Sequence, residues 1–265
     1  QVGASVAQQA ALAIEHARLY AVEQENVRQL EALDQLKADY IAGISHDLKT
    51  PLTGLLGFTK TLNRLGPNLD AERLTRYLGL MERQALVITA MVEDLLLAAR
   101  LEQGDVQPGQ PSVVDLGGVL ADALDLYPPE QRARLIVDVH GPVPVLADES
   151  QILRAVHNLI DNALKYSPDE RKVDVAVFEE RGQAVFEVRD RGPGVPAAER
   201  DRIFERFAPG SSGEERGSTG LGLYISRGIA RGHGGDLTYL DLDGQGACFR
   251  LRLPVRHGEY GPPSE

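Results

Sequence analysis

Cysteine is almost absent from this chain, with one residue, Cys248, among 265. A lone thiol excludes an internal disulfide and a cysteine-rich metal site. Cys248 lies in an alternating stretch typical of a strand, so we expect a buried, small apolar side chain rather than a reactive thiol. The lack of disulfides favours the cytoplasm as the compartment.

Long apolar runs and an excess of positive charge are also missing. No stretch approaches the roughly 20 apolar residues of a membrane-spanning helix, and no signal-peptide pattern is present. Asp and Glu outnumber Lys and Arg by 39 to 28, a net charge of -11. We therefore expect neither nucleic acid nor direct membrane contact as a partner. Because the chain starts at Gln1 inside a helical pattern, we expect it to be a fragment of a longer protein.

Helix-breaking residues are rare over about 6–65, apart from glycines and Pro51. The pattern predicts one helix over about 6–65 and a second over about 70–102, with Asp70 as N-cap after a turn. Two long helices with a short connection form an antiparallel hairpin. One hairpin leaves its apolar stripe facing water, so we expect two copies to form a four-helix bundle, which makes the protein a homodimer.

The segment before residue 38 has a weaker heptad pattern. Its core positions are Leu19, Val22, Asn26, Gln29, Leu33 and Leu36. A core Asn can fix the register of a two-stranded coil. We favour such a coiled coil over a single amphipathic helix.

The composition changes to Gly, Gln and Pro over 104–111, which indicates a linker. Helices are then expected over 119–126, 149–166 and 221–231, and strands over 135–139, 173–179, 184–190, 236–240 and 248–253. This alternation predicts a two-layer α/β sandwich. With the helical hairpin in front of it, the fold class is α+β.

The first chemical motif is the octapeptide at 45–52 in the first predicted helix. If the apolar residues around it are buried, His46 points about 160° away from their centre, toward solvent. Asp47 can then hydrogen-bond one ring nitrogen, fix the tautomer and serve as general base. Taken alone, His46 could be an ordinary surface histidine on a helix. The surrounding octapeptide favours a nucleophilic role instead.

The second motif is a polar helix face. Asn158, Asn162 and Lys165 are spaced by four and three residues and share one side of the helix predicted over 149–166. Amide oxygens suit Mg²⁺, and a lysine can meet a phosphate. The alternative is an amphipathic helix whose polar side has no specific function. Asparagines in a helix interior are mildly unfavourable for stability, which favours a functional role for these two.

Glycines form two further motifs. The segment 190–194 follows a strand, its glycines allow close approach of a ligand, and Asp190 can accept a hydrogen bond from an amine such as adenine's. The segment 217–223 ends a loop and opens a helix, whose N–H groups can bind phosphate. Between them, the polar stretch 208–218 after the apolar residues of 203–207 predicts a mobile lid. There is no P-loop and no dinucleotide-binding unit.

In this order, over about residues 38–254, these segments resemble the histidine kinase family of two-component systems. Residues 46–52 are similar to its phospho-acceptor box. The N box, first glycine box, F box and second glycine box correspond to 158–166, 190–194, 203–207 and 217–223. Lys49 stands where Arg is usual, Ala208 replaces a common aromatic, and Ser218 stands where Gly often begins the second glycine box.

The resemblance implies ATP-dependent autophosphorylation of His46 and phosphotransfer to an aspartate of a response regulator receiver domain. It implies catalytic roles for His46 and Asp47, and a role for Thr50 in a regulator phosphatase activity. The implied ATP-binding residues are Asn158, Asn162, Lys165, Tyr166, Asp190, Gly192, Gly194, Phe207, Gly220, Leu221 and Gly222, with Asn158 and Asn162 also as Mg²⁺ ligands.

The same resemblance implies a domain order. Residues 1–37 look like the last helix of a GAF-type sensor domain and a coiled-coil signalling linker. Residues 38–104 would form the dimerisation and phosphotransfer domain, 111–256 an ATP-binding domain with the fold of gyrase and Hsp90-type ATPases, and 257–265 a tail.

Two other classes of function compete with the kinase. A silent dimeric scaffold would not need the full set of His46, Asn158, Asn162, Asp190 and the glycine boxes. An ATPase clamp of the chaperone or gyrase kind would place an acidic residue at position 158 and would lack the histidine box. The residues present therefore favour the kinase.

Overall fold

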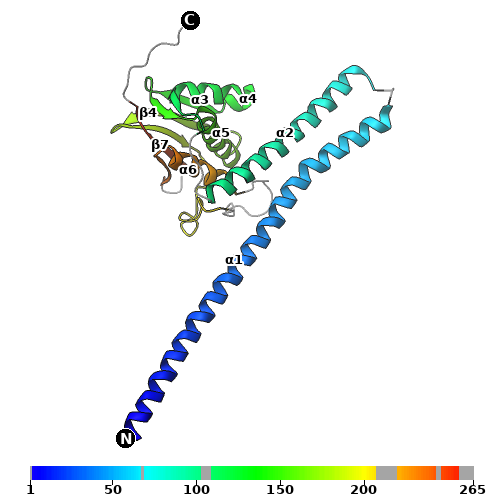
Figure 1. Cartoon of the computed structure of the whole chain (residues 1–265). Helices are drawn as coiled ribbons and strands as arrows, with labels where there is room; N and C mark the ends of the chain where they lie inside the picture. The colour runs from blue at the N-terminus through cyan, green and yellow to red at the C-terminus, as the bar shows by residue number, and fades with distance from the viewer. Residues whose placement is uncertain (1, 67–68, 103–108, 207–219, 243–245, 257–265) are drawn as a thin grey trace.

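The computed structural model describes residues 2–66, 69–102, 109–206, 220–242 and 246–256 (Figure 1). Its first part is a hairpin of two long helices, α1 (Val2–Leu65) and α2 (Ala71–Glu102). The carboxylate of Asp70 accepts a hydrogen bond from the Arg73 amide at 2.7 Å, so the predicted N-cap is confirmed. Helix α1 continues through Pro51 and extends far beyond its partner at the N-terminal end (Figure 1).

The hairpin keeps large apolar side chains in water. Phe58 and Tyr77 pack across it with ring centroids 6.1 Å apart. Other apolar side chains remain about half exposed, namely Leu52, Leu56, Leu74 and Leu78. The backbone of the predicted coiled coil is helical, but the side chains of Gln29, Leu33 and Leu36 lie outside the described residues, and the two-stranded coil stays a prediction.

The second part of the chain is built on a five-stranded mixed sheet in the order β2-β4-β5-β7-β6. The strands are β2 (Leu135–Val139), β4 (Val173–Glu180), β5 (Gln183–Arg189), β6 (Asp236–Asp241) and β7 (Ala247–Pro254). Strands β2 and β4 are parallel and all other neighbours are antiparallel. Strands β4 and β5 turn at Arg181 and Gly182, whose φ angles of 54° and 74° suit a two-residue hairpin loop.

Three helices cover one face of this sheet: α3 (Leu116–Asp125), α5 (Glu149–Tyr166) and α6 (Gly222–Gly232). Ile152 and Leu159 of α5 are fully buried in the same core as Phe186 and Leu251 of the sheet. The predicted two-layer sandwich is therefore confirmed. Cys248 is fully buried in β7, as expected, and burial raises the pKa of its thiol to about 11, which keeps it protonated.

Three short elements were not predicted. Strands β1 (Ser112–Asp115) and β3 (Pro144–Ala147) pair in a separate two-stranded sheet, and α4 (Pro129–Arg132) is a single turn. Helix α3 starts at Leu116 rather than at 119 because Asp115 caps it, accepting from the Gly118 amide at 3.1 Å. None of the described helices is both long and apolar enough to cross a membrane.

The last turns of α2 pack against the sandwich. Ala98 is fully buried and belongs to the core of the sandwich. Leu101 fills the space beside Gly228 of α6, where a Cβ atom would come within 2.3 Å of it. Asp94 forms an ion pair with Arg154 of α5. The hairpin and the sandwich thus meet along α5 and α6.

Candidate functional site

His46 lies on the exposed side of α1, as its position in the sequence predicts. Its side chain is 81% exposed, and its Nδ1 atom lies 3.4 Å from Oδ1 of Asp47. The carboxylate of Asp47 is only 15% exposed, so it is held beside the ring. With Nδ1 facing this carboxylate, Nε2 is the ring nitrogen that a phosphoryl donor can reach.

Thr50 sits one turn after His46. Its hydroxyl donates a hydrogen bond to the carbonyl oxygen of His46 at 3.3 Å. The hydroxyl hydrogen is therefore used within the helix, while the oxygen keeps lone pairs that can accept. The structure thus brings His46, Asp47 and Thr50 together on α1, with His46 and Thr50 exposed and Asp47 partly buried.

Helix α5 carries the predicted polar face. Asp148 caps it by accepting from the Gln151 amide at 3.2 Å, and its apolar residues enter the core. Asn158, Asn162, Lys165 and Tyr166 are all partly exposed on the other side. The Lys165 ammonium lies 5.6 Å from the centre of the Tyr166 ring.

The start of α6 approaches this face. Gly220 has a φ of 63°, which favours glycine, and Leu221 is fully buried at the N-cap. Among the described residues no side chain caps the helix at Leu221, so its first amides can receive an anion. A Cβ at Gly222 would lie 2.5 Å from Oδ1 of Asn158, so only glycine allows this approach.

Asp190 is the buried acid of the site, with 4% of its surface exposed. Its Oδ1 atom accepts hydrogen bonds from the amides of Gly192 at 2.8 Å and Ala247 at 3.0 Å. Burial raises the pKa of this carboxyl, and the two amide bonds oppose that rise. Among the described residues nothing donates to Oδ2, which is left for a ligand.

Glycines make room around Asp190. A Cβ at Gly192 would come within 2.5 Å of the Tyr166 carbonyl oxygen, and one at Gly246 within 2.1 Å of the Asp190 carbonyl oxygen. Gly246 also has a φ of 106°. Gly194, with a φ of 74°, lies against Gly246. The first glycine motif is thus a close-packed backbone turn that holds the acid in place.

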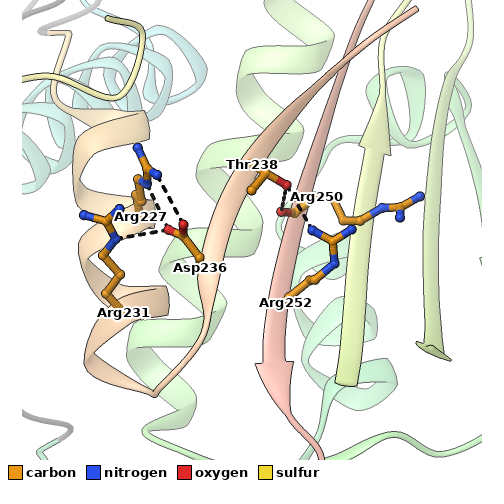
Figure 2. A network of polar contacts seen from close by, with 6 residues as sticks. All are labelled: Arg227, Arg231, Asp236, Thr238, Arg250 and Arg252. Atoms are coloured by element: carbon orange, nitrogen blue, oxygen red, sulfur yellow. Dashed lines mark hydrogen bonds and ion pairs between the residues drawn. The ribbon is translucent and has the colours of Figure 1, made fainter. Parts of the chain in front are cut away.

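The segment that precedes the predicted lid is tied to α6 and the sheet. Phe204 has the guanidinium of Arg227 4.7 Å from its ring centre and meets Phe249 edge-on at 6.3 Å. Figure 2 shows Asp236 of β6 held by Arg227 and Arg231 of α6. The hydrogen bonds from Arg227 are the largest cause that lowers the pKa of Asp236 to about 2. Phe207 and the lid residues 208–218 lie outside the described residues.

Two contributors were missed at the level of sequence. Gly246 comes from the turn between the last two strands, far along the chain from Asp190, and its spacing carries no signal. Ser226 is fully buried in α6, and its hydroxyl receives a hydrogen bond from Nδ2 of Asn158 at 3.0 Å. Its position one turn after Gly222 could have placed it on the same helix face.

Two families cover most of the described site. Residues 36–104 match the His Kinase A (phospho-acceptor) domain, and residues 147–257 match the histidine kinase-, DNA gyrase B- and HSP90-like ATPase family. The first holds His46, and the second holds Asn158, Asp190 and Gly222. The chain therefore belongs to the sensor histidine kinases, a family of protein-histidine kinases, and carries their ATP-binding domain.

Curated relatives and solved structures agree with this. The chain is 33% identical to the phosphate regulon sensor protein PhoR of Pseudomonas aeruginosa over 230 residues, 84% of this chain and 51% of that protein. It is 33% identical to the adaptive-response sensory kinase SasA of Crocosphaera subtropica over 243 residues, 88% and 62% of the two chains. The chain spans about half the length of PhoR and 27% of the sensor protein KdpD of Escherichia coli.

Among solved structures, full-length ShkA in complex with AMPPNP is 28% identical, with a TM-score of 0.57, and the match covers 81% of this chain and 45% of that one. The Acinetobacter baumannii histidine kinase AdeS shares the fold at a TM-score of 0.58 and 24% identity, over 80% of this chain and 98% of that one.

Proposed function

We propose that this chain uses ATP to phosphorylate His46 and then passes the phosphoryl group to an aspartate on the receiver domain of a response regulator. The observation that carries the proposal is the 81% exposed imidazole of His46, held by Asp47, in the same chain as a nucleotide site. An exposed nucleophile on a helix is open to an approaching domain and to a partner protein.

Asp47 prepares His46 for the reaction. When Nδ1 carries the proton and donates it toward Asp47, the lone pair of Nε2 points away and attacks the γ-phosphorus. The bond from phosphorus to the bridging oxygen of ADP breaks as the N–P bond forms. The ring becomes cationic, and the neighbouring carboxylate stabilises that charge.

The nucleotide is held by groups around α5 and α6, together with Phe207, which lies outside the described residues. Oδ2 of Asp190 accepts from the adenine amine, and the uncapped start of α6 at Leu221 and Gly222 faces the phosphates. Gly192, Gly194 and Gly220 allow the close approach, while Tyr166, Lys165 and Phe207 complete the site. The relative ShkA was solved with AMPPNP, which supports a nucleotide at this place.

Mg²⁺ would accompany the phosphates, with Asn158 and Asn162 as its protein ligands. The residues fit such an ion, because Oδ1 of Asn158 accepts no hydrogen bond within the described part of the chain. Amide oxygens are suitable ligands for Mg²⁺, whose other positions are taken by water and phosphate oxygens. The ion would neutralise negative charge on the phosphates.

The whole protein works as a homodimer with this division of labour. Residues 38–104 dimerise and carry His46, 111–256 bind ATP, 1–37 connect to a GAF-type sensor, and 257–265 form a tail. The half-exposed Leu52, Leu56 and Leu78 support the dimer, because pairing two hairpins would cover them. Asp47 and Thr50 add a phosphatase activity toward the regulator.

Labelling with γ-³²P ATP tests the kinase. The full chain should take up label that is acid-labile and alkali-stable, and His46→Gln should lose it while binding ATP as before. His140→Gln is the matched control, since His140 is also exposed and near an aspartate. Label uptake by His46→Gln at the wild-type level would show that His46 is not the acceptor.

A further inference from the structure

Ser226 is a polar residue in an apolar place. It belongs to α6 and is the only fully buried one of the four buried polar or charged residues in the described part of the chain. A buried hydroxyl has to find a hydrogen-bond partner, because leaving one unpaired costs stability. The partner here is Nδ2 of Asn158 on α5, at 3.0 Å.

In this bond the amide nitrogen of Asn158 faces Ser226. An asparagine amide has a nitrogen that only donates and an oxygen that only accepts. With the nitrogen directed at Ser226, the oxygen lies beside the backbone of Gly222 at the start of α6. Among the described residues this Oδ1 atom accepts no hydrogen bond.

Gly222 completes the arrangement from the same helix. It precedes Ser226 by one turn, and a Cβ at this position would lie 2.5 Å from Oδ1 and 2.6 Å from Nδ2 of Asn158. Because Gly222 has no side chain, its backbone can approach the amide closely. Ser226 holds the nitrogen, and the missing Cβ of Gly222 avoids a clash with the oxygen.

We infer that Ser226 is a positioning residue that turns the Asn158 amide oxygen toward the Mg²⁺ ion of bound ATP. The inference rests on the proposed role of Asn158 as a metal ligand. Mg²⁺ requires near-ideal octahedral geometry and short bonds to oxygen, so a ligand held in the correct orientation binds it better than one that rotates. Groups that orient metal ligands typically change metal affinity by about 10- to 100-fold.

The competing explanation is that Ser226 only fills space between α5 and α6. Removal of a purely structural hydroxyl would weaken nucleotide binding equally with and without metal. Removal of a positioning group would weaken only the part that depends on Mg²⁺. The ratio of the ATP dissociation constant in EDTA to that in excess Mg²⁺ separates the two explanations.

Calorimetric ATP titration of the full chain measures this ratio. We expect Ser226→Ala to lower it about tenfold, while affinity in EDTA stays within about twofold of wild type. Ser167→Ala is the matched control, because Ser167 is also buried and its hydroxyl accepts from the Arg191 amide at 3.0 Å. It should leave the ratio unchanged.

Asn158→Ala and the double variant complete the test. If Ser226 acts through Asn158, then Ser226→Ala should have no further effect on the ratio in an Asn158→Ala background. An unchanged ratio in Ser226→Ala, or an equal loss of affinity with and without Mg²⁺, overturns the inference. An unchanged ratio in Asn158→Ala would instead remove Asn158 from the metal site, which is a failure of the proposed function itself.

Discussion

Asp94 of α2 and Arg154 of α5 form an ion pair that ties the helical hairpin to the ATP-binding domain. Each side chain is 30% exposed, so the pair is partly shielded from water. Leu101 packs beside Gly228 at the same junction. Helix α6 also carries Gly222 and Ser226, so the junction involves a helix of the proposed nucleotide site.

Arg154→Asp should loosen this junction. It replaces an attraction with a repulsion of two carboxylates, and a pair of this exposure contributes at most about 1 kcal/mol. We expect amide hydrogen exchange in the last turns of α2 to rise a few-fold. Combining it with Asp94→Arg should restore slow exchange. Arg132→Asp, which breaks an exposed pair with Asp125 inside the ATP-binding part, serves as control. Unchanged exchange in the single variant would mean that the ion pair does not stabilise the contact between α2 and α5.

Asp190→Asn should change the preferred base. Oδ1 of Asp190 already accepts from the amides of Gly192 and Ala247, so the oxygen of an introduced asparagine would take that place. Its NH₂ group would then occupy the position of Oδ2 and face the adenine amine, donor against donor. We expect ATP affinity to fall at least tenfold and ITP, with an oxygen at that position, to bind better than ATP. Equal loss for both nucleotides would show that Asp190 does not contact the base.

Asp236 should make stability depend on pH in a defined window. Hydrogen bonds from Arg227 lower the pKa of this carboxyl to about 2, below its value of about 4 in an unfolded chain. Its contribution is therefore complete above pH of about 4 and is lost as the pH falls toward 2. Urea unfolding should show Asp236→Asn less stable than wild type at pH 6, with the difference shrinking below pH of about 4. A constant difference down to pH 2 would contradict the ion pair.

Periodicity made α5 predictable to the residue, because its apolar residues recur along one face. Strand β2 was also predicted to the residue, but from a short apolar run that is exposed at four of its five positions. The pairing of β1 with β3 was not predictable, since strands of four residues carry too little alternation. Gly117 and Gly118 concealed the start of α3, whose stability there comes from the Asp115 cap. Chemistry within one helix, such as His46 beside Asp47, could be read from spacing alone.

Contacts between distant segments could not be read in this way. Ser226 and Asn158 are 68 residues apart, and the sequence around each residue does not indicate that the two side chains form a hydrogen bond. The same holds for Asp190 and Ala247, which are 57 residues apart. Such pairs follow from strand order and helix packing, which sequence patterns leave open. The residue types at a site were therefore predictable, whereas the orientation of each side chain was not.

The hydrogen bond made by the Thr50 hydroxyl is the basis for a prediction about phosphatase activity. Its hydroxyl donates to the His46 carbonyl oxygen at 3.3 Å, so the hydroxyl oxygen is fixed one turn from the imidazole. With its hydrogen engaged, that oxygen can accept a hydrogen bond from a water. Such a water would be placed for attack on an aspartyl phosphate of a docked regulator.

Thr50→Ala should therefore lose regulator phosphatase activity and keep autophosphorylation. Loss of one positioning contact can cost about 10²-fold in rate, whereas attack by His46 needs only Asp47 beside it. Label uptake and dephosphorylation of the regulator would be measured on the same preparation, with autophosphorylation expected within about twofold of wild type. Thr53→Ala is the matched control, because Thr53 donates in the same way to the Lys49 carbonyl at 2.6 Å but is not one turn from His46. If both activities of Thr50→Ala fell together, Thr50 would act only by shaping the helix before Pro51, and the phosphatase role of Asp47 and Thr50 would be wrong.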